Sequence, residues 1–340
     1  MSARTALAPG RVNLVGEHTD YNDGLALPFA IAQGVTVHAV RIAEPRIEAH
    51  AVDLGERDAF ALHDEPAREP GWRAFVRGTV AELRRAGVDV AGARLRIGGD
   101  VPRGAGLASS AALGVALALA LGGDALDALE LARLCSRVEN EWVGAQTGLL
   151  DQLASLHGEP GAALVIDFRA PSVERVPCEL GDWSLAVLGS GARHTHAEGG
   201  YNARRAEMRR ARERLGVASL RDADPAAVAS LPEPLDRRVR HVLEENARVE
   251  AAAAALRAGD VAALGPLLEA SHASLRDAYE VSVPEVEAAR STLLAAGATG
   301  ARMIGGGFGG SVLGLFPPGS TPPPGALAVQ PAAGARVLAG

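Results

Sequence analysis

The segment Ala8–Leu27 constrains this chain more than any other, because it places apolar strand residues directly beside charged ones. Val12, Leu14 and Val15 stand between two glycine-bearing turns. The polar side chains of the segment include those of Arg11, Glu17, His18 and Asp20. Solvated loops rarely hold valine and leucine beside their charges, so we interpret the segment as a short buried strand that fixes polar groups at one opening. Carboxylates accept hydrogen bonds from vicinal hydroxyls, and a histidine can donate or accept one. This chemistry indicates capture of a small polyol or sugar.

The composition is that of a globular protein with an ample core. The chain has 340 residues, of which 48% are hydrophobic and 22% are charged, which suits two domains or one large α/β domain. Its net charge of −7 argues against a nucleic-acid partner. Cys135 and Cys178 cannot build a disulfide framework, so a reducing cytoplasm is expected. No signal peptide opens the chain, and the longest apolar run, near residues 111–122, is too short to span a bilayer. We expect a soluble cytoplasmic protein with no membrane partner.

The chain contains no lysine, because all 34 of its basic residues are arginine. A Walker A loop and a protein kinase both need a lysine on the nucleotide phosphates. Pyridoxal phosphate enzymes and Schiff-base aldolases need one as a nucleophile. These four classes are therefore excluded.

A second glycine-bearing segment, Gly98–Gly122, leads from a turn into a helix rich in alanine and leucine. The turn and the first helical residues are Gly104, Ala105, Gly106, Leu107, Ala108, Ser109 and Ser110. Helix N-termini attract anions because their N–H groups are free, and small residues let a phosphate approach the backbone. Ser110 is placed to offer a hydroxyl to a bound metal ion. A serine-capped core helix after a glycine turn is the alternative, and this segment alone does not decide between the two.

Two carboxylates farther along the chain favour the phosphate interpretation. Residues 127–144 predict a helix with an inward stripe formed by Leu131, Cys135, Val138 and Trp142. Glu139 borders this stripe. Asp151 stands among leucines and an alanine, where a charge is costly unless it is paired or bound to metal. Either acid, taken alone, could instead cap or pair with a neighbouring element. Beside a phosphate loop, one carboxylate can hold Mg²⁺ and the other can accept a hydroxyl proton.

A third glycine cluster occupies positions 305–310, where five glycines surround Phe308. Such a run cannot form regular structure, so it predicts a tight loop at which other backbone or a ligand comes close. A helix over 284–296 is predicted before this loop, and a strand over Ser311–Phe316 after it. Other strands are predicted over residues 36–43, 93–97, 163–168, 185–188 and 335–338. The strands over 36–43 and 93–97, with the helices after Ser110 and Asp127, make the N-terminal half α+β, and residues from about 190 to the glycine loop are expected to be rich in helix.

Two other polar clusters receive structural interpretations. Residues 204–214 carry six arginines, but Glu207 and Glu213 intervene and the chain is acidic, so a solvated helix face is expected. His194 and His196 lack a cysteine or a nearby third histidine, so we expect them in loop structure rather than in a metal site.

Taken together, the three glycine motifs resemble those of the galactokinases, a branch of the GHMP family of small-molecule kinases. GRVNLVGEHTDYNDG resembles the first signature of the family, VPRGAGLASSAA its phosphate loop and GGGFGG its third motif. Residues 72–78, 201–205, 238–246 and 271–277 fit the family as well, so the resemblance runs nearly end to end. The chain departs from common family residues at Ala108, Thr147, Glu287 and Ser311.

The resemblance implies an α+β, two-lobed GHMP kinase fold with the active site between the lobes. We expect an N-terminal sugar- and phosphate-binding domain over residues 1–178 and a C-terminal domain over residues 179–340. The implied catalytic groups are Asp151 as the base and Arg11 as the transition-state stabiliser. The implied sugar contacts are Glu17, His18, Thr19, Asp20, Asp151 and Tyr201. The implied phosphate loop for ATP is Gly104–Ser110, and the implied Mg²⁺ ligands are Ser110 and Glu139.

The implied reaction is ATP-dependent phosphorylation of the anomeric hydroxyl of galactose, the first committed step of galactose catabolism (the Leloir pathway). The expected partners are therefore a small sugar and ATP, with Mg²⁺ as the cofactor, for a monomer or a weak homodimer. Two alternatives remain. One is a kinase for a related sugar, such as arabinose, galacturonate or N-acetylgalactosamine. The other is a non-catalytic galactose sensor on the same fold. Such a sensor should have a damaged phosphate loop or lack the base, whereas this chain has the loop residues Gly106, Ser109 and Ser110 as well as Asp151.

Overall fold

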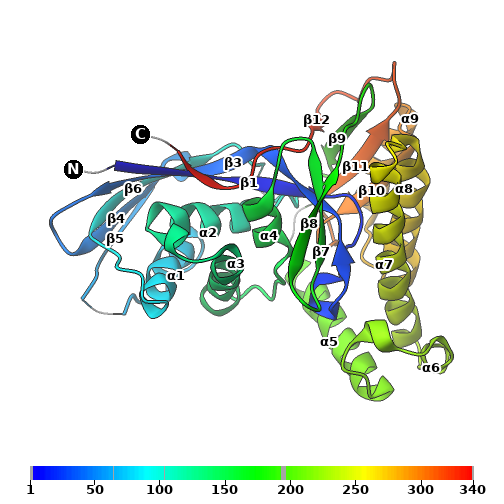
Figure 1. Ribbon diagram of the computed structural model, residues 1–340, viewed down its shortest axis with the longest axis horizontal. Coiled ribbons are helices and arrows are strands. Elements are labelled where there is room, and N and C mark those ends of the chain that lie inside the picture. Colours follow the sequence, from blue (N-terminus) through cyan, green and yellow to red (C-terminus); the bar gives the residue numbers. More distant parts are fainter. Residues whose placement is uncertain (1–2, 64, 103, 193–196, 339–340) are drawn as a thin grey trace.

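The computed structural model describes residues 3–63, 65–102, 104–192 and 197–338. His194 and His196, which we expect in a loop, lie outside the described residues. Figure 1 shows a long sheet with helices packed beneath it, joined to a second group of strands and helices. The α+β class expected from the sequence is confirmed.

The largest sheet has six strands in the order β13-β1-β3-β6-β4-β5. These strands are β1 (Ala3–Asn13), β3 (Pro28–Arg41), β4 (Arg46–Ala51), β5 (Glu56–Ala61), β6 (Ala93–Gly99) and β13 (Arg336–Leu338). Neighbouring strands are antiparallel except β4 and β6, which are parallel. Buried and exposed residues alternate along β6, so one face of this sheet packs on the core and the other meets water.

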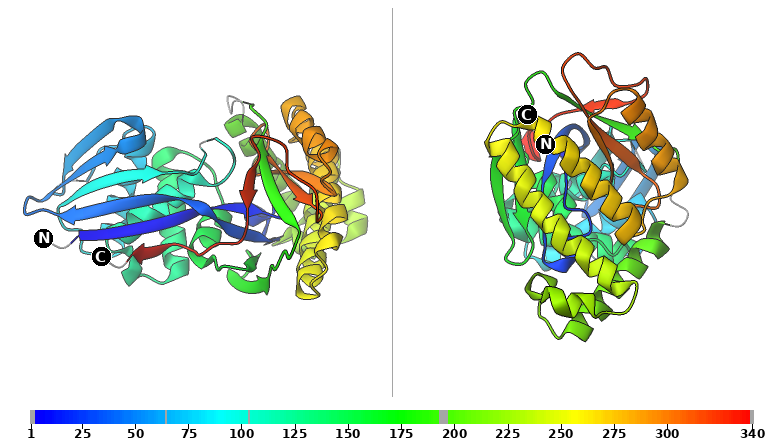
Figure 2. Two further views of the ribbon diagram at one scale, coloured as in Figure 1. Left: turned by 90° about the horizontal axis from the view of Figure 1, so that it is seen from above. Right: turned by 90° about the vertical axis from the view of Figure 1, so that its right-hand side faces the viewer.

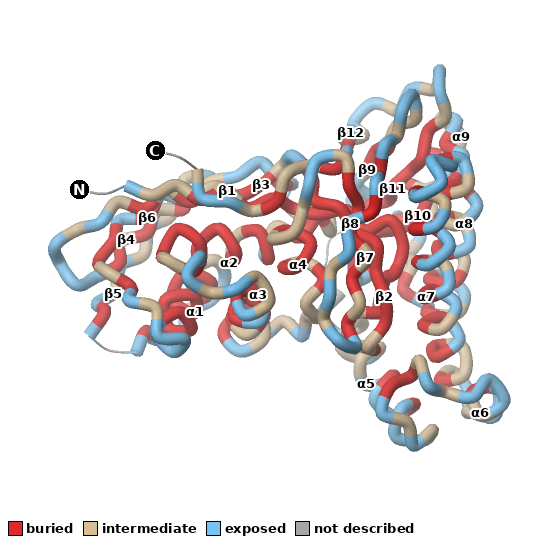
Figure 3. Tube along the Cα trace, viewed as in Figure 1, coloured by how far each residue is buried: buried red, intermediate tan, exposed pale blue. Residues whose placement is uncertain are grey.

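The helices beneath this sheet pack on its buried face or on one another (Figure 1). They are α1 (Trp72–Arg85), α2 (Ser109–Ala120), α3 (Ala128–Arg137) and α4 (Leu150–His157). Helix α2 is buried along almost its whole length (Figure 3) and packs on β1, β3 and α1. Alanine and leucine suit such a helix, because both favour helical backbone and neither has a side-chain polar atom to satisfy. Within the described residues, no helix is both long and apolar enough to cross a membrane.

Two smaller sheets and the remaining helices form the other half of the molecule. The four-stranded sheet, in the order β10-β11-β9-β12, consists of β9 (Ser184–Gly189), β10 (Gly300–Ile304), β11 (Ser311–Phe316) and β12 (Leu327–Val329). The three-stranded sheet, in the order β2-β7-β8, consists of β2 (Leu25–Ala26), β7 (Ala162–Asp167) and β8 (Ser172–Pro177). The helices are α5 (Ala197–Leu215), α6 (Pro225–Ala229), α7 (Leu235–Arg257), α8 (Leu264–Ala273) and α9 (Pro284–Ala295). Figure 2 shows α7, α8 and α9 packed across one end of the molecule.

The two halves share a core. Val12 at the end of β1 and Leu14 just after it belong to the same apolar cluster as residues of α7, β10 and β11. Strand β13 pairs with β1, so the chain returns to the first sheet near its end (Figure 2). The domain boundary expected near Cys178 falls between β8 and β9 and stays a prediction.

The helix expected over residues 127–144 forms as two elements. Asp127 caps α3 in a capping box with Glu130, and α3 ends at Arg137. A π-helical turn, Val138–Val143, follows. The predicted inward stripe is nevertheless buried. Each hydrogen bond of a π-helical turn spans only one residue more than in an α-helix, so Val138 and Trp142 still face the core.

The arginine-rich segment 204–214 lies in α5 and is only partly a solvated face. Arg209, Arg210, Arg212 and Arg214 are exposed, as predicted. Arg204 and Arg205 are half-buried, and for these two the prediction is wrong because both hydrogen-bond to backbone carbonyls of other elements.

Candidate active site

The loop before α2 leaves the N-terminus of that helix open. Ala108 has a φ of 60°, a left-handed conformation, and as the N-cap residue it makes no side-chain cap hydrogen bond. The first N–H groups of α2 therefore receive no cap from this residue, and the helix dipole adds partial positive charge there. Gly106 has a φ of 70°, and a Cβ at this position would lie 3.1 Å from the Ile304 carbonyl oxygen. The loop thus presents bare backbone to an anion.

Arg11, near the end of β1, joins this loop to Asp151. It is 5% exposed. Its Nη1 donates to the Gly106 carbonyl oxygen at 2.5 Å, and its Nη2 lies 2.7 Å from Asp151 Oδ1. Burial alone would lower the pKa of Arg11, but nearby carboxylates, Asp151 foremost, raise it overall, so the guanidinium is charged. Glycine at position 10 permits this approach, because a Cβ there would lie 2.4 Å from the Leu107 carbonyl oxygen.

Glu139 lies in the π-helical turn and belongs to the same site. It is 3% exposed, and its Oε2 accepts hydrogen bonds from Gln152 Nε2 at 2.5 Å and from Thr147 Oγ1 at 3.1 Å. Burial raises the pKa of Glu139 to about 7, and the Asp151 charge adds to this rise. Hydrogen bonds from Ser110, Thr147 and Gln152 act in the opposite direction. A buried carboxylate with so high a pKa has no full counter-charge, and it would be stabilised by a cation.

Ser110 and Glu139 fit Mg²⁺. This ion prefers oxygen ligands and is commonly held by one or two protein groups together with substrate phosphates. A hydroxyl and a buried carboxylate beside an anion-binding helix terminus supply such a set. Among the described residues, no group of three His, Cys, Asp or Glu side chains could hold a metal ion. Phosphate oxygens and water would therefore complete the coordination.

The loop after β1 is braced by its own backbone and by β10. The Thr19 hydroxyl lies within hydrogen-bonding distance of two carbonyl oxygens, that of Gly16 in the same loop at 2.9 Å and that of Leu25 in β2 at 2.7 Å. Glu17 Oε1 accepts a hydrogen bond from the Gly305 N–H at 2.8 Å and lies 3.2 Å from Arg302 Nη2. Thr19 therefore holds the loop together, whereas both contacts of Glu17 are made through one of its two carboxylate oxygens.

His18 and Asp20 are the other titratable groups predicted in this loop. His18 has a φ of 61°, and its Nδ1 lies 2.8 Å from the Tyr21 hydroxyl. Burial lowers the pKa of His18 well below its ordinary value, so the ring is neutral. Burial and the Asp151 charge raise the pKa of Asp20 to about 6. The Asp20 carboxylate lies against the backbone of Gly148, where a Cβ would be 2.0 Å from Oδ2.

Three tyrosine rings surround His18. The centroids of the Tyr279, Tyr201 and Tyr21 rings lie 4.6, 5.4 and 5.9 Å from that of His18. The Tyr21 and Tyr279 hydroxyls are 3.0 Å apart. The cluster offers rigid, amphipathic surface beside the polar groups of the first motif.

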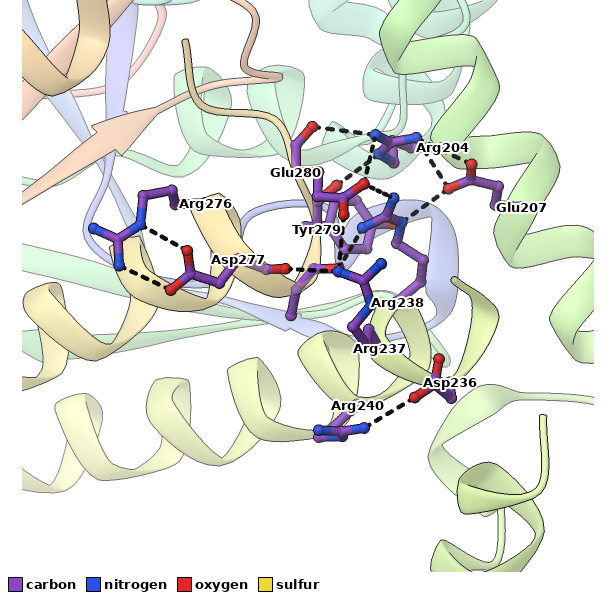
Figure 4. Close-up of polar contacts among 11 residues, drawn as sticks. Arg204, Glu207, Asp236, Arg237, Arg238, Arg240, Arg276, Asp277, Tyr279 and Glu280 are labelled. Carbon is purple, nitrogen blue, oxygen red and sulfur yellow. Dashed lines mark hydrogen bonds and ion pairs between the residues drawn. The ribbon is translucent and has the colours of Figure 1, made fainter. Parts of the chain in front are cut away.

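An ionic network holds Tyr279 from behind (Figure 4). Arg238, 1% exposed, pairs with Glu207 at 3.0 Å and with Glu280 at 2.6 Å, and its guanidinium lies 5.9 Å from the Tyr279 ring. Arg204 donates from Nε to the Tyr279 carbonyl oxygen at 2.6 Å. The network locks α5 and α7 to the turn that follows α8, and so fixes the position of Tyr279.

The third glycine cluster forms the tight loop between β10 and β11, as predicted. A Cβ on Gly306 would lie 2.9 Å from Tyr201 Cδ2, and one on Gly307 would lie 2.6 Å from a valine side chain. A Cβ on Gly305 would be 3.6 Å from Gly106 Cα. The loop therefore closes against Tyr201 on one side and against the second glycine loop on the other.

A cleft of about 390 Å³ opens where these segments meet. The predicted site residues that line it are Arg11, Gly104, Gly106, Leu107, Ala108, Ser109, Ser110, Asp151 and Tyr201. Residues 144–147, 202 and 305–307 complete its described lining. The predicted site residues outside this lining are Glu17, His18, Thr19, Asp20, Ala105 and Glu139. The fold thus brings the phosphate loop, Arg11, Asp151 and Tyr201 together at one opening, with most of the first motif packed behind it.

Three residues without a role in the sequence-based prediction hold the first motif in place. Glu245 Oε1 accepts a hydrogen bond from the Gly16 N–H at 2.8 Å, and Asn246 Oδ1 accepts one from the Leu25 N–H at 2.8 Å. Arg302, fully buried in β10, donates to two carbonyl oxygens just after Val12, each at 2.9 Å. A lone arginine inside an otherwise apolar strand was the available signal for Arg302. Segment 238–246 fitted the family, but the sequence did not show what Glu245 and Asn246 contact.

Three family models match the sequence. The galactokinase galactose-binding signature matches residues 2–41, the GHMP kinases N terminal domain matches residues 74–159, and the GHMP kinases C terminal model matches residues 252–333.

Whole-chain comparisons agree with these matches. The chain is 46% identical over 319 residues to a galactokinase of Mycobacterium tuberculosis, with 91% of this chain and 88% of that protein covered. It is 42% identical over 320 residues to a galactokinase of Streptomyces coelicolor, with 90% and 82% covered. The crystal structure of Lactococcus lactis galactokinase complexed with galactose superposes with a TM-score of 0.90 at 31% identity, covering 99% of this chain and 95% of that one. Methanococcus jannaschii mevalonate kinase, at 17% identity and a TM-score of 0.69, shares the fold alone.

Proposed function

The chain belongs to the GHMP kinase family and, within it, to the galactokinases, and from this premise we propose that it phosphorylates the anomeric (C1) hydroxyl of galactose with ATP. The products are galactose 1-phosphate and ADP, and the step opens galactose catabolism. The observation that carries the proposal is the double contact of Arg11, which reaches Gly106 in the phosphate loop at 2.5 Å and Asp151 at 2.7 Å. A carboxylate suited to act as base thus stands beside a backbone suited to bind phosphate.

Asp151 acts as the general base in this proposal. Its side chain is 25% exposed, and it lines the cleft. The carboxylate accepts the proton of the C1 hydroxyl as the sugar oxygen attacks the γ-phosphorus. A bond forms between that oxygen and phosphorus, the bond from phosphorus to the β–γ bridging oxygen breaks, and ADP leaves with the electron pair. Phosphoryl transfer needs little covalent help from a protein, so positioning and charge stabilisation account for most of the catalysis.

Arg11 and the α2 terminus provide that charge stabilisation. The guanidinium is charged and already oriented by Gly106 and Asp151, so it loses little freedom when phosphate oxygens arrive. The N–H groups at the start of α2 hold the phosphates from the other side. Mg²⁺ held by Ser110 and Glu139 would neutralise charge on the β- and γ-phosphate oxygens.

The sugar is bound by the first motif together with Tyr201. Glu17, His18 and Asp20 offer acceptors, and a neutral His18 can also donate. Each hydrogen bond to an ionised carboxylate contributes about 1.5–3 kcal/mol, and an analogue that leaves a buried carboxylate unpaired is rejected strongly. Thr19 serves this pocket indirectly, because its hydroxyl braces the loop. We place the enzyme in the cytoplasm as a monomer or weak homodimer, a setting in which Cys135 and Cys178 stay free thiols.

The decisive experiment is ADP release from MgATP with a panel of aldoses: galactose, glucose, arabinose, galacturonate and N-acetylgalactosamine. Asp151→Asn keeps the size of the side chain and removes the base. Asp182→Asn, at an exposed position, is the matched control for the loss of one carboxylate charge.

Galactose-dependent ADP release that persists in the Asp182 variant and vanishes in the Asp151 variant supports the proposal. Release with another aldose alone overturns the substrate and keeps the mechanism. If no aldose elicits ADP while galactose still raises the melting temperature, the protein is a sensor rather than a kinase.

A further inference from the structure

Arg205 makes contacts that its place in an arginine-rich helix does not explain. Its guanidinium carbon lies 4.8 Å from the centre of the Tyr21 ring, within the range of a cation–π interaction. Its Nη1 donates to the Gln146 carbonyl oxygen at 2.8 Å. The side chain is also hydrogen-bonded to Tyr201, one helical turn earlier in α5. The three contacts together hold the guanidinium in one orientation.

Each partner of Arg205 belongs to a different part of the candidate site. Tyr21 follows the predicted sugar-binding run and contacts His18. Gln146 lies in the segment 144–147, which lines the cleft between the π-helical turn and α4. Tyr201 lines the same cleft from α5. Arg205 therefore links the first motif, the loop that leads to Asp151, and α5.

Arg205 also sets the electrostatic environment of Asp20. The charged and titratable groups that act on Asp20 are Arg11, Glu17, Tyr21, Asp151, Tyr201 and Arg205. Burial and the charges of Asp151 and Glu17 raise the pKa of Asp20, and Arg205 lowers it. Arg11 is already paired with Asp151, so Arg205 is the cation placed to favour ionised Asp20.

We propose that Arg205 is a positioning residue for sugar binding, which clamps Tyr21, Gln146 and Tyr201 together and presents a positive charge to Asp20. The proposal rests on the proposed function, because it takes Asp20 as an acceptor for sugar hydroxyls. Arg205 acts through these neighbours rather than on the reacting atoms. Its loss should therefore weaken capture of the sugar and leave ATP binding intact.

The test compares Arg205→Met and Arg205→Lys with Arg209→Met. Arg209 lies one turn farther along α5 and is exposed, so its substitution removes the same charge from the same helix. Galactose affinity is measured by calorimetry without ATP, and kcat/KM for galactose is measured from pH 5 to 8. Melting temperatures confirm that each variant is folded.

We expect Arg205→Met to weaken galactose binding roughly tenfold, the size of one charge-assisted hydrogen bond, with the KM for ATP unchanged. Removing the cation raises the pKa of Asp20 above about 6, so the acidic limb of kcat/KM moves to higher pH. Arg205→Lys keeps the charge, and its acidic limb should stay in place while binding weakens. Arg209→Met should match the wild type in both measurements.

Wild-type galactose affinity together with a wild-type acidic limb in Arg205→Met would overturn the assignment. An equal shift in Arg209→Met would overturn it as well, because the effect would then be one of net charge. Failure of the wild-type protein to bind galactose would instead count against the proposed function. The ratio of variant to wild-type affinity would then be taken with the aldose that does bind.

Discussion

Gly148→Ala should displace the Asp20 carboxylate while leaving the fold intact. The backbone at Gly148 is not in the left-handed region, so alanine brings no conformational strain of its own. Its Cβ, however, would lie 2.0 Å from Asp20 Oδ2, and real Cβ contacts essentially never fall under 3.0 Å. The carboxylate must therefore retreat by about 1 Å, the difference between these two distances.

The size of the effect follows from that displacement. Rotating Asp20 away from its preferred rotamer costs about 0.5–1.5 kcal/mol, so the melting temperature should fall by a few degrees at most. A group misplaced by about 1 Å in an active site can cost roughly 10²-fold in rate. We expect kcat/KM for galactose to fall by about this factor, mainly through KM, and the KM for ATP to be unchanged.

The assay is steady-state ADP release with galactose and ATP varied separately. Gly199→Ala, in α5, is the control, because its Cβ meets open space and its backbone is also outside the left-handed region. A Gly148 variant with wild-type KM for galactose would refute the reasoning that Asp20 binds the sugar. A fall in kcat at constant KM would show that the loop leading to Asp151 had moved instead of Asp20.

Glu139→Gln should raise the melting temperature of the ligand-free protein at pH 8 by several degrees. The folded-state pKa of about 7 lies above the ordinary 4.5, so the free energy of unfolding falls as pH rises through this interval. Calorimetry from pH 5 to 8 should show a smaller loss of stability with pH for the variant than for the wild type. An equal loss in both proteins would count against this argument. Glu245→Ala should lower the free energy of unfolding by about 3–5 kcal/mol at pH 7, since it leaves buried partners unpaired. Burial acts against ionisation of Glu245, but nearby basic groups hold its pKa at about 2, so this stabilisation is present above about pH 4.5 and lost toward pH 2. The difference in free energy of unfolding between variant and wild type, measured with denaturant, should therefore shrink in acid. A difference that stays constant would contradict the argument. Gly10→Ala should raise the KM for ATP, because its Cβ would lie 2.4 Å from a backbone oxygen of the phosphate loop that cannot rotate away. Gly189→Ala is the control, because its Cβ would meet open space. Equal KM values for ATP in the two variants would exclude the effect.

Local sequence patterns predicted part of the secondary structure and many of the residues that line the cleft. The strand Ser311–Phe316 is present with the predicted bounds, because a short apolar run after a glycine loop is typical of a fully buried strand. The helix predicted over 284–296 ends one residue earlier. The polar groups of the first motif, the small-residue loop and the apolar neighbours of Asp151 were likewise evident from adjacent residues. The π-helical turn that carries Glu139 was not, because a widened turn leaves the inward stripe almost unchanged.

Contacts between distant segments depend on tertiary structure. Arg11 and Asp151 are 140 positions apart in the chain, yet their side chains are 2.7 Å apart in the fold. No local pattern encodes that meeting, since it requires β1, the phosphate loop and α4 to pack together first. The positions of Glu245 and Arg302 behind the first motif, and the inward turn of Arg205, are of the same kind. By itself, the sequence determined which side chains were available and which segments bury apolar surface, because both are properties of neighbouring residues. Only the tertiary structure decided which of those side chains meet, because each of these contacts spans segments that long-range packing brings together.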